Sequence, residues 1–234
     1  MSALGTLFAV GAGPGDPELI TLKAVRVLGQ TPVVFAASSS KNDYSLALSI
    51  VSPHLRPDTP VVRLPFPMTR DRRVLEAAWL ANATLVLEHL RTGRDAAFVT
   101  LGDPVTYSTY QYLSRTLRAV EPDVPLAIVS GVSSIQAASA AAGRGLAESG
   151  ENLLVLSGVD SPERLRRSLE IADNAVILKA YRTFPQLKAL LCEMGLADKA
   201  VLVSRCGLDG QAVHQGLSNC PDKPPYFSLI LVKK

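Results

Sequence analysis

The chain has 234 residues, 47% hydrophobic and 19% charged, so it can bury one large core or two small ones. Its net charge of +3 comes from basic residues spread along the chain, which disfavours a nucleic acid partner. The three cysteines form no CxxC pair, and no apolar run resembles a secretory signal or reaches membrane-spanning length. We therefore expect a reduced, cytoplasmic protein with no membrane partner.

The first half of the chain alternates short apolar runs with amphipathic stretches, a pattern typical of strands and helices around a parallel sheet. Strands are expected at residues 7–10, 32–36, 61–64, 96–101 and 126–129, with 61–64 at an edge. Helices are expected at residues 17–28, closed by Gly29, and at 44–51, 72–92, 104–120 and 135–142.

The second half changes character. Strands are expected at residues 153–156, 176–178, 200–204, 211–215 and 227–232, the last three with short connections, which favours a mixed sheet. Helices are expected at residues 186–193 and after a Ser161 cap. The fold class is α/β, and the Pro-rich connection at residues 121–125 is expected to divide it into domains at residues 1–122 and 123–234.

Two strand-to-helix turns carry the sequence Gly-Asp-Pro, at residues 15–17 and 102–104. Each follows a buried apolar run and offers an Asp to cap a helix and a Pro for its first position. Such turns lie at the carboxyl ends of strands, where ligands bind in α/β sheets. The two turns therefore predict a ligand site.

The first turn also suggests a dinucleotide site, and the residues argue against one. Gly11 and Gly13 fit the Gly-x-Gly-x-x-Gly pattern, but Asp16 stands at the third glycine position. Its carboxylate would repel a pyrophosphate, and Pro14 removes a backbone donor. A nucleotide-dependent oxidoreductase is therefore disfavoured, and the loop is suited to a bulky, non-phosphate ligand.

Three motifs in order carry a resemblance to a known family: Gly-x-Gly-Pro-Gly-Asp at residues 11–16, Gly-Asp-Pro-x-x-Tyr at 102–107 and Gly-Val-Ser-Ser at 131–134. Together they resemble the tetrapyrrole methylases, which transfer a methyl group from S-adenosylmethionine, and the resemblance covers essentially the whole chain. Stretches at residues 45–51, 64–71 and 225–232 are similar to the subfamily that methylates C20 of precorrin-2 in cobalamin synthesis. The resemblance implies two α/β domains, the methyl donor in the cleft between them and a homodimer.

The resemblance also implies which residues hold the methyl donor. They are Pro14, Leu101, Gly102, Asp103, Thr106, Ser133, Ser134, Leu178 and Gly207. Three positions depart from the family pattern. Leu178 stands where many relatives carry methionine, Ser130 replaces the proline usual before Gly131, and Gln211 stands where an acidic residue is frequent.

The chain offers no evident catalytic triad or dyad, and its three histidines have no metal-ligand spacing, so no metal site and no catalytic residue is assigned. Methyl transfer from an activated donor mainly requires positioning of the reactants. Asp103 can orient the donor or simply cap a helix, and Asp16 can touch the substrate or cap.

The anionic tetrapyrrole substrate calls for cations at the rim of the site. Lys41 and Arg70, with Arg72 and Arg73 nearby, are candidates to meet its carboxylates, although solvated side chains would look the same in sequence. Two further alternatives stay open: a methylase of the same fold acting at another ring position or on a modified protein histidine, and a binding module without catalysis.

Overall fold

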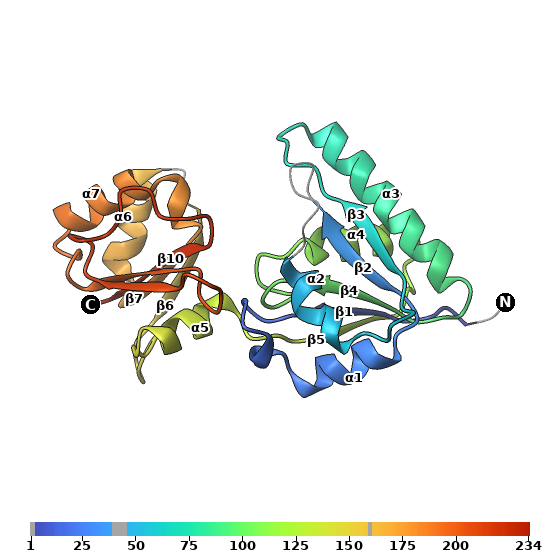
Figure 1. Ribbon diagram of the computed structural model, residues 1–234. Coiled ribbons are helices and arrows are strands. Elements are labelled where there is room, and N and C mark those ends of the chain that lie inside the picture. The colour runs from blue at the N-terminus through green and yellow to red at the C-terminus, as the bar shows by residue number, and fades with distance from the viewer. Residues whose placement is uncertain (1–2, 39–45, 159–160) are drawn as a thin grey trace. The chain divides into compact units, whose positions relative to one another are not determined.

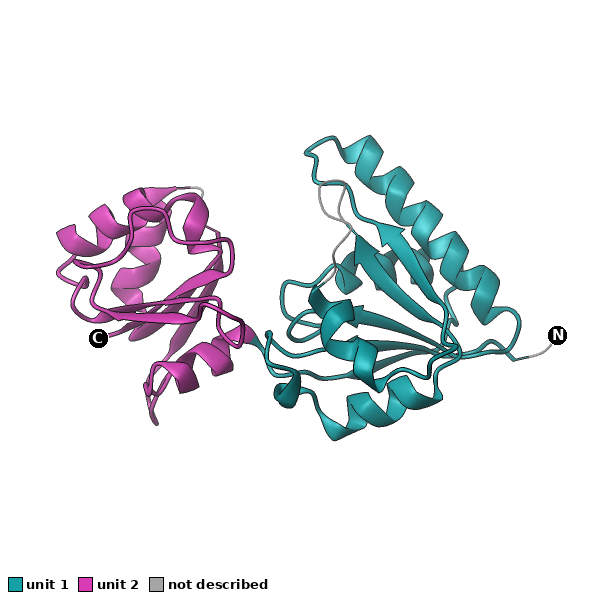
Figure 2. Cartoon of the chain, viewed as in Figure 1, with its two compact units in different colours: residues 1–133 teal, residues 134–234 magenta. Residues whose placement is uncertain are grey.

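The computed structural model describes residues 3–38, 46–158 and 161–234, which divide into two compact units, Met1–Ser133 and Ser134–Lys234 (Figures 1 and 2). Each unit is built on its own five-stranded sheet. The α/β class and the two-domain organisation expected from the sequence are confirmed.

The first unit contains a fully parallel sheet in the order β3-β2-β4-β1-β5. Its strands are β1 (Leu7–Gly11), β2 (Val34–Ser38), β3 (Val61–Pro65), β4 (Ala96–Thr100) and β5 (Leu126–Val129). The edge position predicted for β3 is confirmed. The helices are α1 (Leu22–Gln30), α2 (Leu46–Val51), α3 (Arg72–Leu90) and α4 (Tyr110–Val120).

Strand β4 shows why this sheet is covered on both faces. Ala96 and Phe98 pack into the core beneath α3 and α4, whereas Ala97 and Val99 pack into the core formed with α1 and α2. Because successive side chains of a strand point to opposite faces, an uninterrupted apolar strand requires helices on both sides. Both faces of β4 are therefore covered, and a ligand can reach this strand only at its carboxyl end.

The second unit contains a mixed sheet in the order β6-β7-β10-β8-β9, in which only β6 and β7 run parallel. The strands are β6 (Leu153–Ser157), β7 (Asn174–Leu178), β8 (Ala200–Ser204), β9 (Ala212–Gln215) and β10 (Ser228–Lys233). The helices are α5 (Ser134–Ala141), α6 (Pro162–Ile171) and α7 (Phe184–Glu193). The predicted mixed sheet and the Ser161 cap of α6 are confirmed.

The domain boundary expected at residues 122 and 123 is wrong. Strand β5 pairs in parallel with β1, with Leu126 opposite Leu7, so it belongs to the first sheet. The units divide at Ser133, after the turn that follows β5. A Pro-rich connection can join two elements of one sheet as readily as two domains, and strand pairing decides which.

Two predicted helices also begin later than expected. Residues 17–28 form a single 3-10 turn, Pro17–Leu19, followed by α1, which Thr21 caps and which runs through Gly29 to Gln30. The predicted helix at residues 104–120 starts only at Tyr110, because Tyr107 adopts a left-handed backbone with φ of 50°. Among the described helices, none is both long and apolar enough to cross a membrane.

Candidate functional site

Three turns meet at the carboxyl edge of the first sheet, after β1, β4 and β5. The backbone N–H of Gly102 donates to the carbonyl of Gly13 at 2.7 Å, and Gly13 N–H donates back to Gly102 at 3.3 Å. Ala12 N–H also donates to the Thr100 carbonyl at 2.8 Å. The turns after β1 and β4 are thus bonded to each other through their backbones.

Two glycines allow these turns to approach so closely. A Cβ placed on Gly131 would lie 2.3 Å from the Gly102 carbonyl oxygen, and one on Gly11 would lie 2.6 Å from the same atom. The Gly102 carbonyl cannot move aside easily, because it is part of the backbone. Gly102 itself has a positive φ of 69°, a conformation that a side chain would strain.

Asp103 joins the second turn to the third. One carboxylate oxygen accepts a hydrogen bond from Val105 N–H at 2.9 Å, and the other accepts from Gly131 N–H at 3.1 Å. The prediction that Asp103 caps a helix beginning at Pro104 is wrong, because residues 104–109 form turns. The carboxylate instead holds two loops together, a role that the sequence spacing did not reveal.

Asp16 behaves as its capping interpretation predicted. Its carboxylate accepts from Glu18 N–H at 2.8 Å and opens the 3-10 turn Pro17–Leu19. Ser130, which stands where the family usually has proline, is held by other contacts. Its carbonyl accepts from the Thr21 hydroxyl at 3.4 Å, and the following N–H, of Gly131, donates to Asp103. The third turn therefore keeps its anchorage without a proline.

Thr100, the last residue of β4, was missed by the sequence analysis. Its side chain is buried, with 6% exposure, and its hydroxyl has no hydrogen-bond partner among the described residues. A buried hydroxyl without a partner is costly unless something pairs with it. Its position at a buried strand's polar carboxyl end, directly before Leu101 and Gly102, was the available signal.

The predicted donor-site residues of the first unit gather at this junction. Pro14 is buried beside Gly13, Leu101 and Thr106 flank Asp103, and the backbone of Ser133 lies 3.9 Å from where a Gly102 Cβ would be. Ser134 opens α5 in the second unit. The glycine-lined junction, with a partnerless hydroxyl beside it, suits a ligand that lies against backbone.

The remaining predicted donor-site residues lie at one edge of the second sheet. Leu178 ends β7 and Gly207 follows β8, and both strands flank β10. The carbonyl of Leu178 accepts from Gly158 N–H at 3.2 Å. Gly207, with φ of 73°, donates its N–H to the side-chain oxygen of Gln211 at 2.7 Å. Gln211 thus holds the Gly207 turn without a charge.

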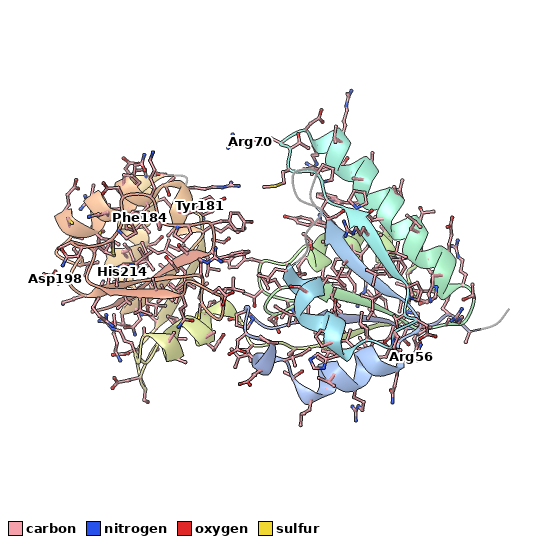
Figure 3. The ribbon with its side chains drawn as sticks, in the orientation of Figure 1. Arg56, Arg70, Tyr181, Phe184, Asp198 and His214 are labelled. Atoms are coloured by element: carbon pink, nitrogen blue, oxygen red, sulfur yellow. The ribbon has the colours of Figure 1, made fainter. Side chains whose placement is uncertain are left out.

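The predicted substrate-binding cations differ in their surroundings. Arg70 is exposed in the loop before α3 (Figure 3), whereas Arg72 forms an ion pair with Glu76 at 2.8 Å. Lys41 lies outside the described residues. Between residues 3 and 234, apart from the undescribed segments, no three His, Cys, Asp or Glu side chains are grouped to hold a metal ion.

An aromatic and cationic cluster on the second unit was not predicted from the sequence. Tyr181 packs against Tyr226 with ring centroids 5.0 Å apart, and Tyr226 packs against Phe227 at 4.8 Å. The Nε of Arg182 donates to the Tyr181 hydroxyl at 2.8 Å. The available signal was that Tyr181 and Arg182 come shortly after the carboxyl end of a strand.

Comparisons with known proteins agree with this geometry. The family model of the tetrapyrrole (corrin/porphyrin) methylases matches residues 6–219. The chain is 37% identical to a cobalt-precorrin-2 C(20)-methyltransferase of Salmonella typhimurium, over 98% of this chain and 97% of that protein. It is 33% identical to a precorrin-2 C(20)-methyltransferase of a Sinorhizobium species, over 98% and 95%.

Solved structures show the same fold. A uroporphyrin-III C-methyl transferase from Thermus thermophilus, complexed with S-adenyl homocysteine, superposes with a TM-score of 0.66 over 98% of each chain, at 22% identity. The resemblance seen in the three turn motifs is therefore confirmed along nearly the whole sequence. This chain belongs to the tetrapyrrole (corrin/porphyrin) methylases.

Proposed function

We propose that this protein transfers a methyl group from S-adenosylmethionine to C20 of precorrin-2 or its cobalt form, as a step of cobalamin biosynthesis. The observation that carries the proposal is the glycine-locked junction of the turns after β1, β4 and β5, where Asp103 bonds to Gly131 N–H at 3.1 Å. Full-length relatives at 33–37% identity are named for this C20 reaction.

When bound, S-adenosylmethionine supplies a sulfonium-activated methyl group. The junction supports its binding because small residues expose backbone, and because a carboxylate keeps two of the turns at a fixed separation. In the transfer the methyl–sulfur bond would break as the new bond to C20 forms, sulfur would keep the electron pair, and the proton of C20 would pass to water. Positioning alone contributes a large acceleration to such an in-line transfer.

One relative is named for cobalt-precorrin-2 and the other for precorrin-2. An assay is therefore needed to decide whether the substrate of this protein carries cobalt. The protein is incubated with methyl-labelled S-adenosylmethionine and precorrin-2, with and without cobalt. We expect one methyl per tetrapyrrole, located at C20 by nuclear magnetic resonance. A methyl at another ring position, or no turnover with either substrate, would overturn the proposal.

We also propose one methyl-donor site per chain, a homodimer and a cytoplasmic setting. The odd number of cysteines, three with no CxxC pair, supports a reducing compartment. Exposed apolar side chains on α3 and α4, among them Leu80, Leu85 and Tyr112, support association of two copies. Calorimetry with S-adenosylhomocysteine checks the stoichiometry. Light scattering that gives only the 24.9 kDa monomer mass would reject the dimer.

A further inference from the structure

We propose that Arg182, oriented by Tyr181, binds a carboxylate of the tetrapyrrole, and that the exposed rings beside it receive the edge of the macrocycle. This inference rests on the proposed function for the identity of the substrate. It assigns substrate recognition to the second unit, in addition to the cations of the first unit expected from the sequence.

The backbone after β7 places Arg182 at the surface, with Tyr181 half-buried beside it. Lys179 adopts a left-handed conformation with φ of 57°, and a 3-10 turn, Ala180–Arg182, follows. Ala180 and Phe184 on either side are buried in the core of the second unit, with 1% and 0% exposure. The turn is therefore pinned at both ends, and the residues between them are held in place.

The Arg182 guanidinium is fixed by an aromatic partner instead of an acid. Its Nε donates to the Tyr181 hydroxyl at 2.8 Å, and its central carbon lies 5.7 Å from the centre of the Tyr181 ring. Among the described residues no carboxylate lies within ion-pair distance of it. The Tyr181 hydrogen bond also raises the pKa of Arg182, whose side chain is charged like that of any arginine.

This arrangement suits an incoming carboxylate. The terminal nitrogens of a guanidinium bind a carboxylate in a planar, two-point fashion, and holding Nε in place reduces the entropy lost on binding. Lys179 next to it is exposed on a flexible stem, and Arg205 already donates to the Asp209 carbonyl at 2.6 Å. Of these three cations, Arg182 is therefore the one best suited to meet a carboxylate.

The neighbouring rings provide an apolar surface. Tyr226 is 57% exposed and Phe227 38% exposed, although they pack against each other and Tyr226 packs against Tyr181. A contiguous group of exposed aromatic side chains is typical of a binding surface. A tetrapyrrole with acetate and propionate arms combines the two chemistries that the cluster offers, a broad apolar ring and peripheral carboxylates.

The cluster lies at the edge of the second sheet that carries two predicted donor contacts. Leu178 stands opposite Leu229 in the register of β7 and β10, and Ser204, at the end of β8, stands opposite Ser228. Tyr226 and Phe227 immediately precede β10, Tyr181 follows β7 and Gly207 follows β8. Substrate and donor contacts on one edge are what methyl transfer between them requires.

The test compares Arg182→Ala, Arg182→Lys and Tyr181→Phe with a matched control, Arg167→Ala, which removes an exposed arginine from α6. Binding of precorrin-2 is titrated by fluorescence, and steady-state constants are measured for both substrates. For Arg182→Ala we expect tetrapyrrole affinity to fall about three- to tenfold, with a matching rise in KM and kcat spared. Arg182→Lys should recover part of the loss, and Tyr181→Phe should lose about two- to threefold.

Affinity for S-adenosylhomocysteine should stay unchanged in every variant, and the salt dependence of precorrin-2 binding should be shallower in Arg182→Ala than in wild type. If Arg182→Ala binds precorrin-2 as tightly as wild type, or weakens the donor equally, the inference is wrong even where C20 methylation is observed. If wild type binds precorrin-2 through Arg182 without methylating C20, the inference stands and the proposed reaction fails. Wild type that binds no tetrapyrrole would overturn both.

Discussion

The two units differ in what they present at the ends of their strands, backbone in the first and side chains in the second. In the first unit three parallel strands end in turns that touch through backbone, and a Cβ on Gly131 would sit 2.3 Å from a carbonyl oxygen. In the second unit the mixed sheet ends in side chains: exposed Arg182, Tyr226 and Phe227, with half-buried Tyr181 between them. A backbone site admits few substitutions, whereas a side-chain site can be altered one contact at a time.

This comparison suggests a division of labour. The rigid glycine junction suits a donor that is the same in every reaction of the family, and the side-chain edge suits recognition of a particular tetrapyrrole. Substitutions in the junction should therefore affect donor binding and stability together. Substitutions of the aromatic and cationic side chains of the second unit should affect the tetrapyrrole alone.

The largest effect is expected from Gly131→Ala. The new Cβ would overlap the Gly102 carbonyl oxygen at 2.3 Å, and backbone cannot yield without separating the turns. We expect a loss of about 3 kcal/mol in the free energy of unfolding and no detectable donor binding, measured by urea denaturation and calorimetry. Gly145→Ala is the control, because nothing lies within 4 Å of its Cβ position. Equal stability of the two variants would contradict a locked junction.

A smaller loss of stability is expected from Gly102→Val. Its Cβ position has no neighbour closer than 3.9 Å, so the cost comes from the positive φ of 69° and amounts to about 1–2 kcal/mol. Donor binding should be abolished while the far-ultraviolet circular dichroism spectrum remains native-like. Gly150→Val is the control, because Gly150 also has a positive φ, 87°, and open space around it. It should lose similar stability through backbone strain and keep its donor affinity. Unchanged donor affinity in Gly102→Val would remove Gly102 from the site.

Asp103→Asn should act through geometry rather than folding. The amide can accept only one of the two backbone hydrogen bonds, from Val105 and Gly131, and places a donor against the other N–H. We expect donor affinity to fall about tenfold, for a loss of about 1–2 kcal/mol. Asp16→Asn is the comparison, since Asn is an equally good cap there. The same loss in both variants would mean that Asp103 only supports its own turn.

The smallest effect is expected at the basic rim of the first unit. Arg70→Ala should raise the KM for the tetrapyrrole by at most about fivefold, corresponding to 1 kcal/mol or less, with kcat unchanged. Lys41→Ala is expected to behave in the same way. Arg72→Ala should do less, because that arginine already pairs with Glu76. Steady-state kinetics at low and at molar salt check this prediction, because the Debye length shortens to about 3 Å at molar ionic strength. If the affinity of wild type for the tetrapyrrole does not depend on salt, these residues are solvated side chains that do not bind the substrate.

Sequence reasoning succeeded where the determinants are local. Buried apolar runs predicted every strand of both sheets within a few residues, and Ser161 was placed correctly as a cap because a capping side chain bonds to an N–H three residues away. The turn motifs located the junction because parallel strands in an α/β sheet present their carboxyl ends at one edge.

Only the tertiary structure decided the contacts between distant residues. Capping its own helix was one of two roles considered for Asp103, yet its carboxylate reaches Gly131, 28 residues later. Strand β5 joined the first sheet through pairing with β1, and Tyr181 met Tyr226 through the pairing of β7 with β10. Such contacts depend on strand order and register, which helical and strand periodicities do not encode. Local chemistry therefore determined the helices, the strands and most of the turns at the junction, and sheet topology decided how they are joined.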